Sequence, residues 1–197
     1  HFSVLCGLAE DWRGKMTVQL CPFTGIGDGA PWISEIAAVA AAQPVSGILS
    51  IFVHPVDDLD GALDDVFKIA QDHELELDFH VDENLDPASS ALDCVARAAL
   101  RHRFERPVLA GHCCALAVEP EEVVKRTLDR VAEAGVGVVT LPLCNAYLMD
   151  RQGERTPRYR GVAPVHEMKQ RGIRVAIASD NIQDGYHAYG DLNLPQV

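Results

Sequence analysis

One short segment of the sequence combines an imidazole with several carboxylates. In residues 78–83, which read Asp-Phe-His-Val-Asp-Glu, the alternation of a strand places Asp78, His80 and Asp82 on one face, with Glu83 just beyond its end. A neutral imidazole is a good ligand for zinc or ferrous iron, and a nearby carboxylate can carry a proton. The segment is therefore either a metal and proton-transfer site or a half-buried strand end with solvated acids.

A second histidine, His112, follows a run of small and apolar residues that begins at position 107. Such a histidine is either a core residue with a hydrogen-bond partner or a ligand. The cysteines that follow it, Cys113 and Cys114, are not expected to hold one ion together, because neighbouring residues of a strand point to opposite faces.

A third apolar run, residues 175–178, leads into Ser179, Asp180 and Asn181. Burying an unpaired carboxylate costs free energy, so we expect a metal ion or a cationic partner beside Asp180. The alternative is that Asp180 caps a following helix, since aspartate is a favoured capping residue. Residues 182–190 have no clear helical pattern, which favours the first interpretation.

Strands and amphipathic helices alternate along the chain, at the spacing of repeated βα units. The expected strands are residues 16–23, 45–53, 75–82, 107–112, 135–143 and 173–180. The expected helices are residues 31–42, 58–72, 87–103, 120–134 and 162–171. Pro120 followed by Glu121 and Glu122 is typical of a helix N-terminus.

The side chains that could do chemistry lie at or just beyond the carboxyl ends of the expected strands. They are His80, Glu83, His112, Asn145 and Asp180, on four different strands. Continuously apolar strands such as 136–143 indicate a parallel sheet covered by helices, and a (β/α)8 TIM barrel gathers strand ends at one mouth. The glycine-rich residues 25–29 lack the GxGxxG spacing of a dinucleotide-binding fold. We therefore expect one α/β domain over residues 1–197, with about six βα units of a (β/α)8 barrel.

The chain is acidic, with 17 basic and 29 acidic residues and a formal net charge of −12. Its electrostatic field would repel nucleic acids and anionic membranes, so we expect neither as a partner and favour a small neutral or cationic substrate. Six cysteines without a CxxC pair indicate reduced, buried thiols in a cytoplasmic protein. The apolar residues 2–9 are too few to cross a bilayer.

The order of these motifs resembles the cytosine deaminase branch of the amidohydrolase superfamily. In that family, a His with a trailing Glu, a second His, a PLxN segment and a metal-binding Asp follow one another on strands five to eight of a metal-dependent hydrolase barrel. The corresponding residues here are His80 with Glu83, His112, residues 141–145 (Leu-Pro-Leu-Cys-Asn) and Asp180. Further similarities are Arg160-Gly161, Glu167-Met168 and Tyr189-Gly190. The resemblance covers the chain from Met16 onward.

The resemblance implies a hydrolase that deaminates an aminated heterocycle, either cytosine or a related pyrimidine or triazine. One divalent metal ion, zinc or iron, would bind His80 and Asp180 and activate a water that attacks the amino-bearing ring carbon, so that ammonia leaves. Glu83 would pass a proton to the ring, His112 would orient the attacking water, and Asp180 would take a proton from that water. The expected substrate contacts are Asn145, Asn181 and His54.

The sequence departs from the family in lacking an HxH pair, which supplies two metal ligands on the first strand of the family's barrel. The six expected strands would be strands three to eight, so we expect an incomplete barrel whose natural N-terminus precedes His1. With His80 and Asp180 as its metal ligands, the isolated chain is expected to bind metal weakly, and therefore to be inactive or metal-poor. The exposed sheet edges of such a barrel would favour a homo-oligomer.

Two other functions fit the same residues. A related metal site could hydrolyse a cyclic amide or cleave an exocyclic substituent, and product analysis would separate these reactions from deamination. The chain could instead be a non-catalytic fragment that binds a small heterocycle, since it lacks the HxH pair. Residues 22–25 contain no glutamine where the cytosine enzymes read the pyrimidine edge, and Asn181 stands where the family has a second aspartate, so the heterocycle is open.

Overall fold

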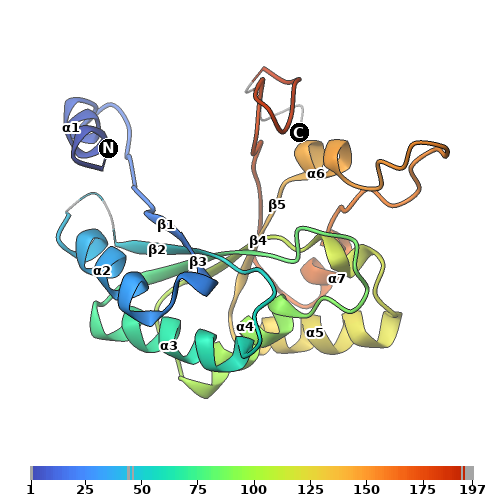
Figure 1. Ribbon diagram of the computed structural model, residues 1–197, viewed down its shortest axis with the longest axis horizontal. Helices are drawn as coiled ribbons and strands as arrows, with labels where there is room; N and C mark the ends of the chain where they lie inside the picture. Colours follow the sequence, from blue (N-terminus) through green and yellow to red (C-terminus); the bar gives the residue numbers. More distant parts are fainter. Residues whose placement is uncertain (1, 44, 46, 192, 194–197) are drawn as a thin grey trace.

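Six parallel strands form one sheet, in the same order in space as along the chain (Figure 1). They are β1 (Phe23–Gly25), β2 (Ile48–Phe52), β3 (Glu76–Val81), β4 (Val108–His112), β5 (Gly137–Thr140) and β6 (Val175–Ile177). The computed structural model describes residues 2–43, 45, 47–191 and 193. Strands β1 and β6 are the two ends of the sheet, which is open. The expected α/β fold, an incomplete barrel of about six βα units, is confirmed.

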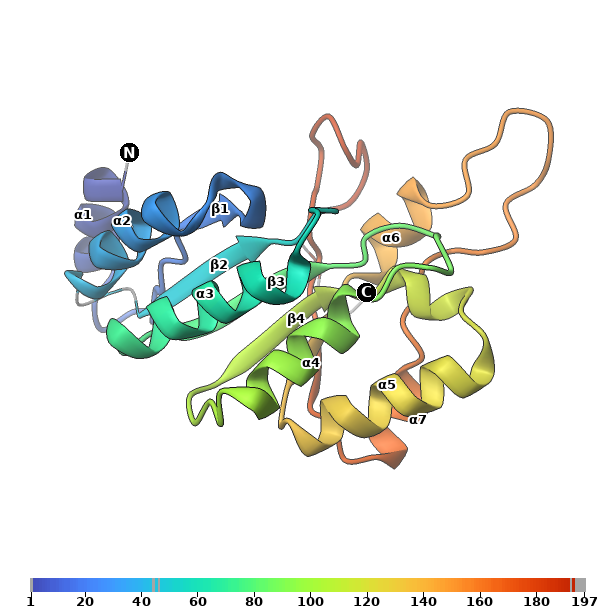
Figure 2. The same ribbon diagram turned by 60° about the horizontal axis from the view of Figure 1, so that its bottom comes forward.

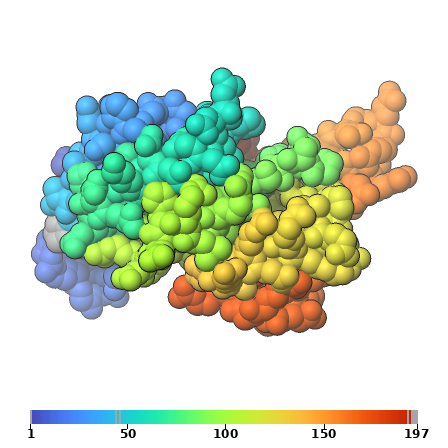
Figure 3. All heavy atoms as spheres, turned by 90° about the horizontal axis from the view of Figure 1, so that it is seen from below, coloured from blue at the N-terminus to red at the C-terminus, as the bar shows by residue number. Residues whose placement is uncertain are grey.

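Helices cover one face of the sheet. The connecting helices are α2 (Ala30–Ala41), α3 (Leu59–Asp72), α4 (Ala91–Arg101), α5 (Glu121–Glu133) and α7 (Val165–Gln170). Figure 2 shows α3, α4 and α5 in front of the strands, and Figure 3 shows the continuous outer layer that they form. The described part also contains α1 (Phe2–Asp11), α6 (Pro142–Leu148) and the 3₁₀ turns η1 (Ile26–Asp28) and η2 (Cys114–Ala117). Within the described ranges, no helix is both long and apolar enough to cross a membrane.

The core lies between the sheet and this helical layer. Along β3, Leu77 and Phe79 are at most 1% exposed and face the helices, whereas Asp78 and His80 alternate with them on the opposite, inner face. Phe79 stacks on Phe67 of α3, with ring centroids 5.8 Å apart. Burying such side chains is the main favourable term that holds helices on a sheet. The same alternation therefore fixes His80 on the inner face.

The predicted first strand, residues 16–23, is wrong over most of its length. Strand β1 begins only at Phe23, and residues 16–22 form no regular strand. This segment still runs beside β2: the Leu20 amide donates to the Val45 carbonyl, and the Ser50 amide donates to the Pro22 carbonyl. It leads into an edge strand, where an alternating apolar pattern is not enough to form a continuous ladder.

The other predicted elements are confirmed with shifted ends. Strands β2 to β6 lie within their predicted ranges, although Ser46 of the second range lies outside the described residues. Helices α4 and α7 are shorter than predicted. The sequence pattern does not predict α1 or α6, and α6 begins at Pro142, where the fifth strand is expected to continue. Proline fits the first turn of a helix, since it has no backbone N–H to lose there.

The cysteines agree only partly with the expectation of buried thiols. All six are free. Four of them are buried, but Cys21 is exposed and Cys6 is half-buried, so the expectation is wrong for these two. Both lie in the N-terminal segment, outside the main sheet and its helical layer.

Candidate active site

A cleft of about 470 Å³ opens at the carboxyl ends of the strands. Its lining residues are Phe23, Phe52, His80, Glu83, His112, Leu148, Asp180, Asn181 and Tyr186. They come from segments far apart in the sequence, and the parallel sheet brings them together because all its strands end on the same side. The cleft therefore includes four residues that the sequence assigns to metal binding, proton transfer or orientation of the attacking water: His80, Glu83, His112 and Asp180.

His80 reaches the cleft from the inner face of β3. Its neighbours in the sheet are Phe52 of β2 and Gly111 of β4. Its Nε2 lies 3.7 Å from Oδ2 of Asp78, and Asp78 accepts a hydrogen bond of 2.6 Å from the Ser50 hydroxyl. Asp78 is thus held in place as an acidic neighbour of the His80 ring.

His112 reaches the cleft through a left-handed turn of the backbone. In the sheet register it pairs with Val81, whose side chain is buried on the helix side. The φ angles of His112 and Cys113 are 71° and 54°, a conformation that costs about 1–2 kcal/mol per residue that has a Cβ. His112 Nε2 lies 3.3 Å from His80 Nδ1, and His112 is 2% exposed. The strained turn therefore places His112 against His80, where regular alternation would not.

Glu83 and His112 have pKa values shifted in opposite directions by the same cause. Burial raises the pKa of Glu83 to about 7, and the nearby Asp180 carboxylate adds to the shift. Burial lowers the pKa of His112 to about 4. Glu83 Oε1 lies 3.5 Å from His112 Nδ1. Near neutral pH the imidazole is therefore neutral, and the Glu83 carboxyl group holds a proton part of the time.

Asp180 completes a group of three possible metal ligands. Glu83, His112 and Asp180 each offer one ligand atom, and these atoms lie within 4.8 Å of one another. Asp180 Oδ2 is buried and has no hydrogen-bond partner among the described residues. No helix begins at Asp180, so it is not a helix cap. A buried, unpaired carboxylate oxygen beside an imidazole and a second carboxylate fits a divalent cation.

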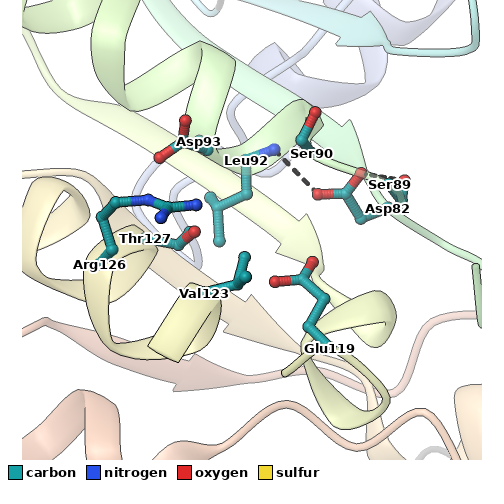
Figure 4. A pocket seen from close by; sticks show the side chains of 9 residues that line it. All are labelled: Asp82, Ser89, Ser90, Leu92, Asp93, Glu119, Val123, Arg126 and Thr127. Atoms are coloured by element: carbon teal, nitrogen blue, oxygen red, sulfur yellow. Dashed lines mark hydrogen bonds between the residues drawn. The ribbon is translucent and has the colours of Figure 1, made fainter. Parts of the chain in front are cut away.

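Asp82 does not lie beside His80 on the inner face, so this part of the sequence prediction is wrong. Its φ is 52°, in the left-handed region, and it is 4% exposed. Its carboxylate accepts hydrogen bonds from the backbone amides of Ala91 at 3.0 Å and Leu92 at 2.9 Å, and from the Ser89 hydroxyl at 2.6 Å. Figure 4 shows the carboxylate directed at the start of α4. Asp82 therefore caps α4 rather than joining the site.

The capping carboxylate lines a second, smaller cavity of about 40 Å³ between α4 and α5 (Figure 4). Asp93, Glu119 and Arg126 also line it. Burial raises the pKa of Glu119 to about 7, and Asp82 and Asp93 add to the shift. This cavity shares no lining residue with the cleft, so it is a separate feature of the helical layer.

The three expected substrate contacts lie in different surroundings. Asn181 lines the cleft. Asn145 is 1% exposed and is not part of the cleft wall, and its side chain lies against His112. His54 is also outside the cleft wall, and its Nε2 accepts a 3.4 Å hydrogen bond from the Gly27 amide. The structure thus brings one of the three to the cleft itself.

The sequence reasoning misses the apolar part of the cleft wall. This part consists of Phe23, Phe52, Leu148 and Tyr186. Phe52 could be found only from the register, which pairs it with His80, because apolar side chains lie on both faces of β2. The Phe23 ring lies 5.0 Å from His80 and 6.3 Å from Phe52 between ring centroids. These aromatic side chains give the cleft a wall suited to a planar ring.

Comparisons with known sequences extend over most of the chain. The model of the amidohydrolase family matches residues 28–196. Pterin deaminase of Rhizobium rhizogenes (strain K84 / ATCC BAA-868) is 39% identical over 199 aligned positions, which include 100% of this chain and 45% of that protein. The chain spans less than half the length of this relative.

Solved structures share the fold at lower identity. The 5-methylcytosine deaminase from Klebsiella pneumoniae, liganded with phosphonocytosine, superposes with a TM-score of 0.87 and 22% identity, over 98% of this chain and 48% of that one. The N-isopropylammelide isopropylaminohydrolase from Burkholderia multivorans gives a TM-score of 0.75 and 22% identity, over 98% of this chain and 46% of that one. At these identities the similarity concerns the fold alone.

Proposed function

This chain belongs to the amidohydrolase family, and from that premise we propose that it carries the active site of a hydrolytic deaminase of an aminated nitrogen heterocycle. In such a reaction water replaces an exocyclic amino group on the ring, and ammonia leaves. The observation that carries the proposal is the convergence of Glu83, His112 and Asp180, with ligand atoms within 4.8 Å of one another at the carboxyl ends of the strands.

The donor set of the cleft fits one divalent metal ion. Asp180 offers a buried carboxylate oxygen without a partner in the described structure, and imidazole and further carboxylate groups lie next to it. Zinc, iron and manganese all accept such ligands. We propose His80 and Asp180 as ligands. The three donors that lie within 4.8 Å of one another are Glu83, His112 and Asp180, and His80 adjoins this group through its 3.3 Å contact with His112. When bound, the ion would lower the pKa of a water molecule toward neutrality and so supply a nucleophile.

The side chains of the cleft would hold and move the protons. With a pKa of about 7, Glu83 can hold a proton near neutral pH and give it to a ring nitrogen or to the leaving amine. Oδ2 of Asp180 has no protein partner in the described structure and is free to accept a proton from the attacking water. His112 is neutral near pH 7 and would orient that water by a hydrogen bond without adding charge.

A planar, aminated ring is the substrate class that fits the cleft, and a pterin is the first compound to test. The exposed rings of Phe23, Phe52 and Tyr186 offer stacking surfaces. The 39% identity to pterin deaminase supports a bicyclic ring, while cytosine, related pyrimidines and triazines stay candidates. Asn181 lines the cleft, and the expected substrate contacts of Asn181, Asn145 and His54 all stay predictions.

The proposal is tested by measuring ammonia release. The purified full gene product, supplied with zinc or ferrous iron, is incubated with pterin, cytosine, isocytosine and an aminated triazine. We expect ammonia and the corresponding oxo-heterocycle from at least one compound. A ring-opened acid would instead identify a cyclic amide hydrolase. Tight binding of a heterocycle without turnover would identify a binding protein, and either result would overturn the proposal.

A further inference from the structure

Asn145 lies on α6, behind the wall of the cleft, and α6 fixes its position. It is 1% exposed. Its backbone amide donates to the Leu141 carbonyl at 3.0 Å, and its carbonyl accepts from the Met149 amide at 2.9 Å. These two bonds hold the backbone of Asn145 in the helix. Its side chain can therefore approach the cleft residues only from the side of α6.

The side chain of Asn145 contacts one particular nitrogen of His112. Its Nδ2 lies 3.1 Å from His112 Nδ1. With Nδ2, the donor end of the amide, on this side, Nδ1 accepts and the neutral imidazole carries its proton on Nε2, while Oδ1 of Asn145 is buried without a partner among the described residues. In the metal-free protein that Nε2–H group can then donate to Nδ1 of His80, 3.3 Å away. The amide thus sets the direction of a hydrogen-bond chain from Asn145 through His112 to His80.

Glu83 competes for the same nitrogen. Its Oε1 lies 3.5 Å from His112 Nδ1, a longer contact than that of Asn145. A carboxylate oxygen accepts, and would therefore favour a proton on Nδ1, whereas the amide donor of Asn145 favours a bare Nδ1. The position of the ring proton therefore depends on which of the two side chains holds Nδ1.

We propose that Asn145 is a positioning residue that keeps His112 in the tautomer protonated on Nε2. The tautomer presents an N–H donor beside His80, at the cleft, and prevents His112 from donating a hydrogen bond to Glu83. The catalytic meaning of this arrangement rests on the proposed function, in which His112 orients water and Glu83 transfers a proton. The arrangement itself can be tested without metal or substrate.

The ring tautomer is read by ¹H–¹⁵N NMR of the metal-free chain labelled with ¹⁵N-histidine, since protonated and bare ring nitrogens have well-separated shifts. A His112→Gln variant assigns the signals. We expect His112 to be protonated on Nε2 in the wild type. In Asn145→Ala, measured at a pH above 7 where Glu83 is mostly ionised, the Glu83 carboxylate is the remaining partner of Nδ1, so we expect the proton to move to Nδ1. Asn145→Asp, which has nearly the same shape but only accepts at this position, should do the same, so either variant suffices if the other does not fold.

A matched control is Gln152→Ala, which removes an exposed amide whose oxygen bonds to Arg155 in the loop of residues 150–160. It should keep the wild-type tautomer. Protonation of Nδ1 in the wild type, or an unchanged Nε2–H tautomer in a folded Asn145 variant, would overturn the proposal. A negative ammonia assay would count against the proposed function and would not change this spectrum, so the two failures are distinguishable.

Discussion

The chemistry of the cleft depends on two residues whose pKa values are shifted in opposite directions by their surroundings. Burial raises the pKa of Glu83 to about 7 and lowers that of His112 to about 4. A carboxyl group that holds a proton near neutral pH therefore lies beside an imidazole that does not. Pairs of this kind are common in active sites, where one group must donate a proton and another must stay uncharged.

Replacing Glu83 by glutamine tests its role in proton transfer. The amide of Glu83→Gln keeps the size and hydrogen-bonding capacity of the side chain but cannot exchange a proton, so we expect kcat for ammonia release to fall about 10²–10⁴-fold. Glu133→Gln, at the exposed end of α5, is the matched control and should keep wild-type kcat. Equal kcat values in the two variants would contradict a role for Glu83 in transferring protons.

At the scale of residues, the sequence predicts the identity of the cleft side chains well. It predicts the backbone conformation that brings them to the cleft less well. His80 follows from the alternation along β3, and Glu83 and Asp180 follow from their places beyond the ends of strands. The sequence places Asp82 on the wrong face, and the position of His112 can be explained only from the structure. Asp82 and His112 have left-handed φ angles of 52° and 71°, which break the alternation of a strand. Residues with a Cβ rarely adopt this conformation, so no sequence pattern predicts it.

The elements around the cleft are joined by carboxylates that bind backbone amides. Asp82 links the end of β3 to the first turn of α4, and it is 4% exposed. The first backbone N–H groups of a helix have no partners within that helix, so a carboxylate there satisfies two of them at once. The same bond holds the segment that carries Glu83 against the helical layer.

Removing this cap should weaken the whole domain. We expect Asp82→Ala to lower the free energy of unfolding by about 1–3 kcal/mol, because two buried amides lose their partner. The measurement is urea denaturation followed by circular dichroism. Asp72→Ala, at the exposed end of α3, is the control and should change stability by less than about 0.5 kcal/mol. Equal stability of the two variants would show that Asp82 does not cap α4 in solution.

The loop after α6 is organised by another carboxylate, that of Asp150. Its Oδ2 accepts hydrogen bonds from the backbone amides of Arg158 at 2.6 Å and Tyr159 at 3.1 Å, and it also pairs with the Arg155 side chain. These bonds lower the pKa of Asp150 from its ordinary 3.8 to about 2, with the Arg158 amide as the largest cause. The carboxylate stabilises the loop fully above pH 3.8, and this stabilisation is lost as the pH falls toward 2.

Hydrogen exchange measures this effect at the two amides concerned. Near neutral pH, Asp150→Asn should speed the exchange of the Arg158 and Tyr159 amides, because a neutral amide oxygen is a weaker acceptor than a carboxylate. Glu154→Gln, an exposed change in the same loop, should leave both rates unchanged. Wild-type exchange rates in Asp150→Asn would mean that the carboxylate does not organise the loop.

At the scale of elements, the sequence predicts the central strands and the helices of the outer layer well, because long periodic patterns specify them. It fails at the ends of the fold. The alternating residues 16–22 look like a strand but form none, although Leu20 and Pro22 bond to the backbone beside β2 at the edge of the sheet. Helix α6 continues an apolar run that began as β5, and only the position of Pro142 signals the change.

The molecule as a whole is an open sheet with apolar side chains at both ends. Phe23 on β1 is 56% exposed, and Ile177 on β6 is 55% exposed. Exposed strand edges carry unpaired backbone groups, and with apolar side chains beside them they favour pairing with another surface. This agrees with the expectation of a homo-oligomer but does not test it.

Sedimentation velocity tests the association of this chain directly. We expect the average mass to rise above 21.4 kDa as the concentration increases. Ile177→Lys puts a charge on the edge strand and should reduce the rise. Val4→Lys, at a 73% exposed position on α1 outside the sheet, is the control and should leave the association unchanged. A mass of 21.4 kDa at all concentrations would contradict association through the sheet.

The role of Asp180 in the chemistry of the cleft is the centre of the proposed function. The most direct measurement compares ammonia release by two variants of the full gene product, loaded with metal, on the best heterocycle of the panel. Asp180→Asn changes the carboxylate of the cleft, and Asp129→Asn changes an exposed carboxylate on α5 that pairs with Arg171. We expect Asp180→Asn to lower kcat/KM about 10²–10⁴-fold and Asp129→Asn to keep the wild-type value. Wild-type activity in a folded Asp180→Asn variant would contradict the assignment of this cleft as the active site.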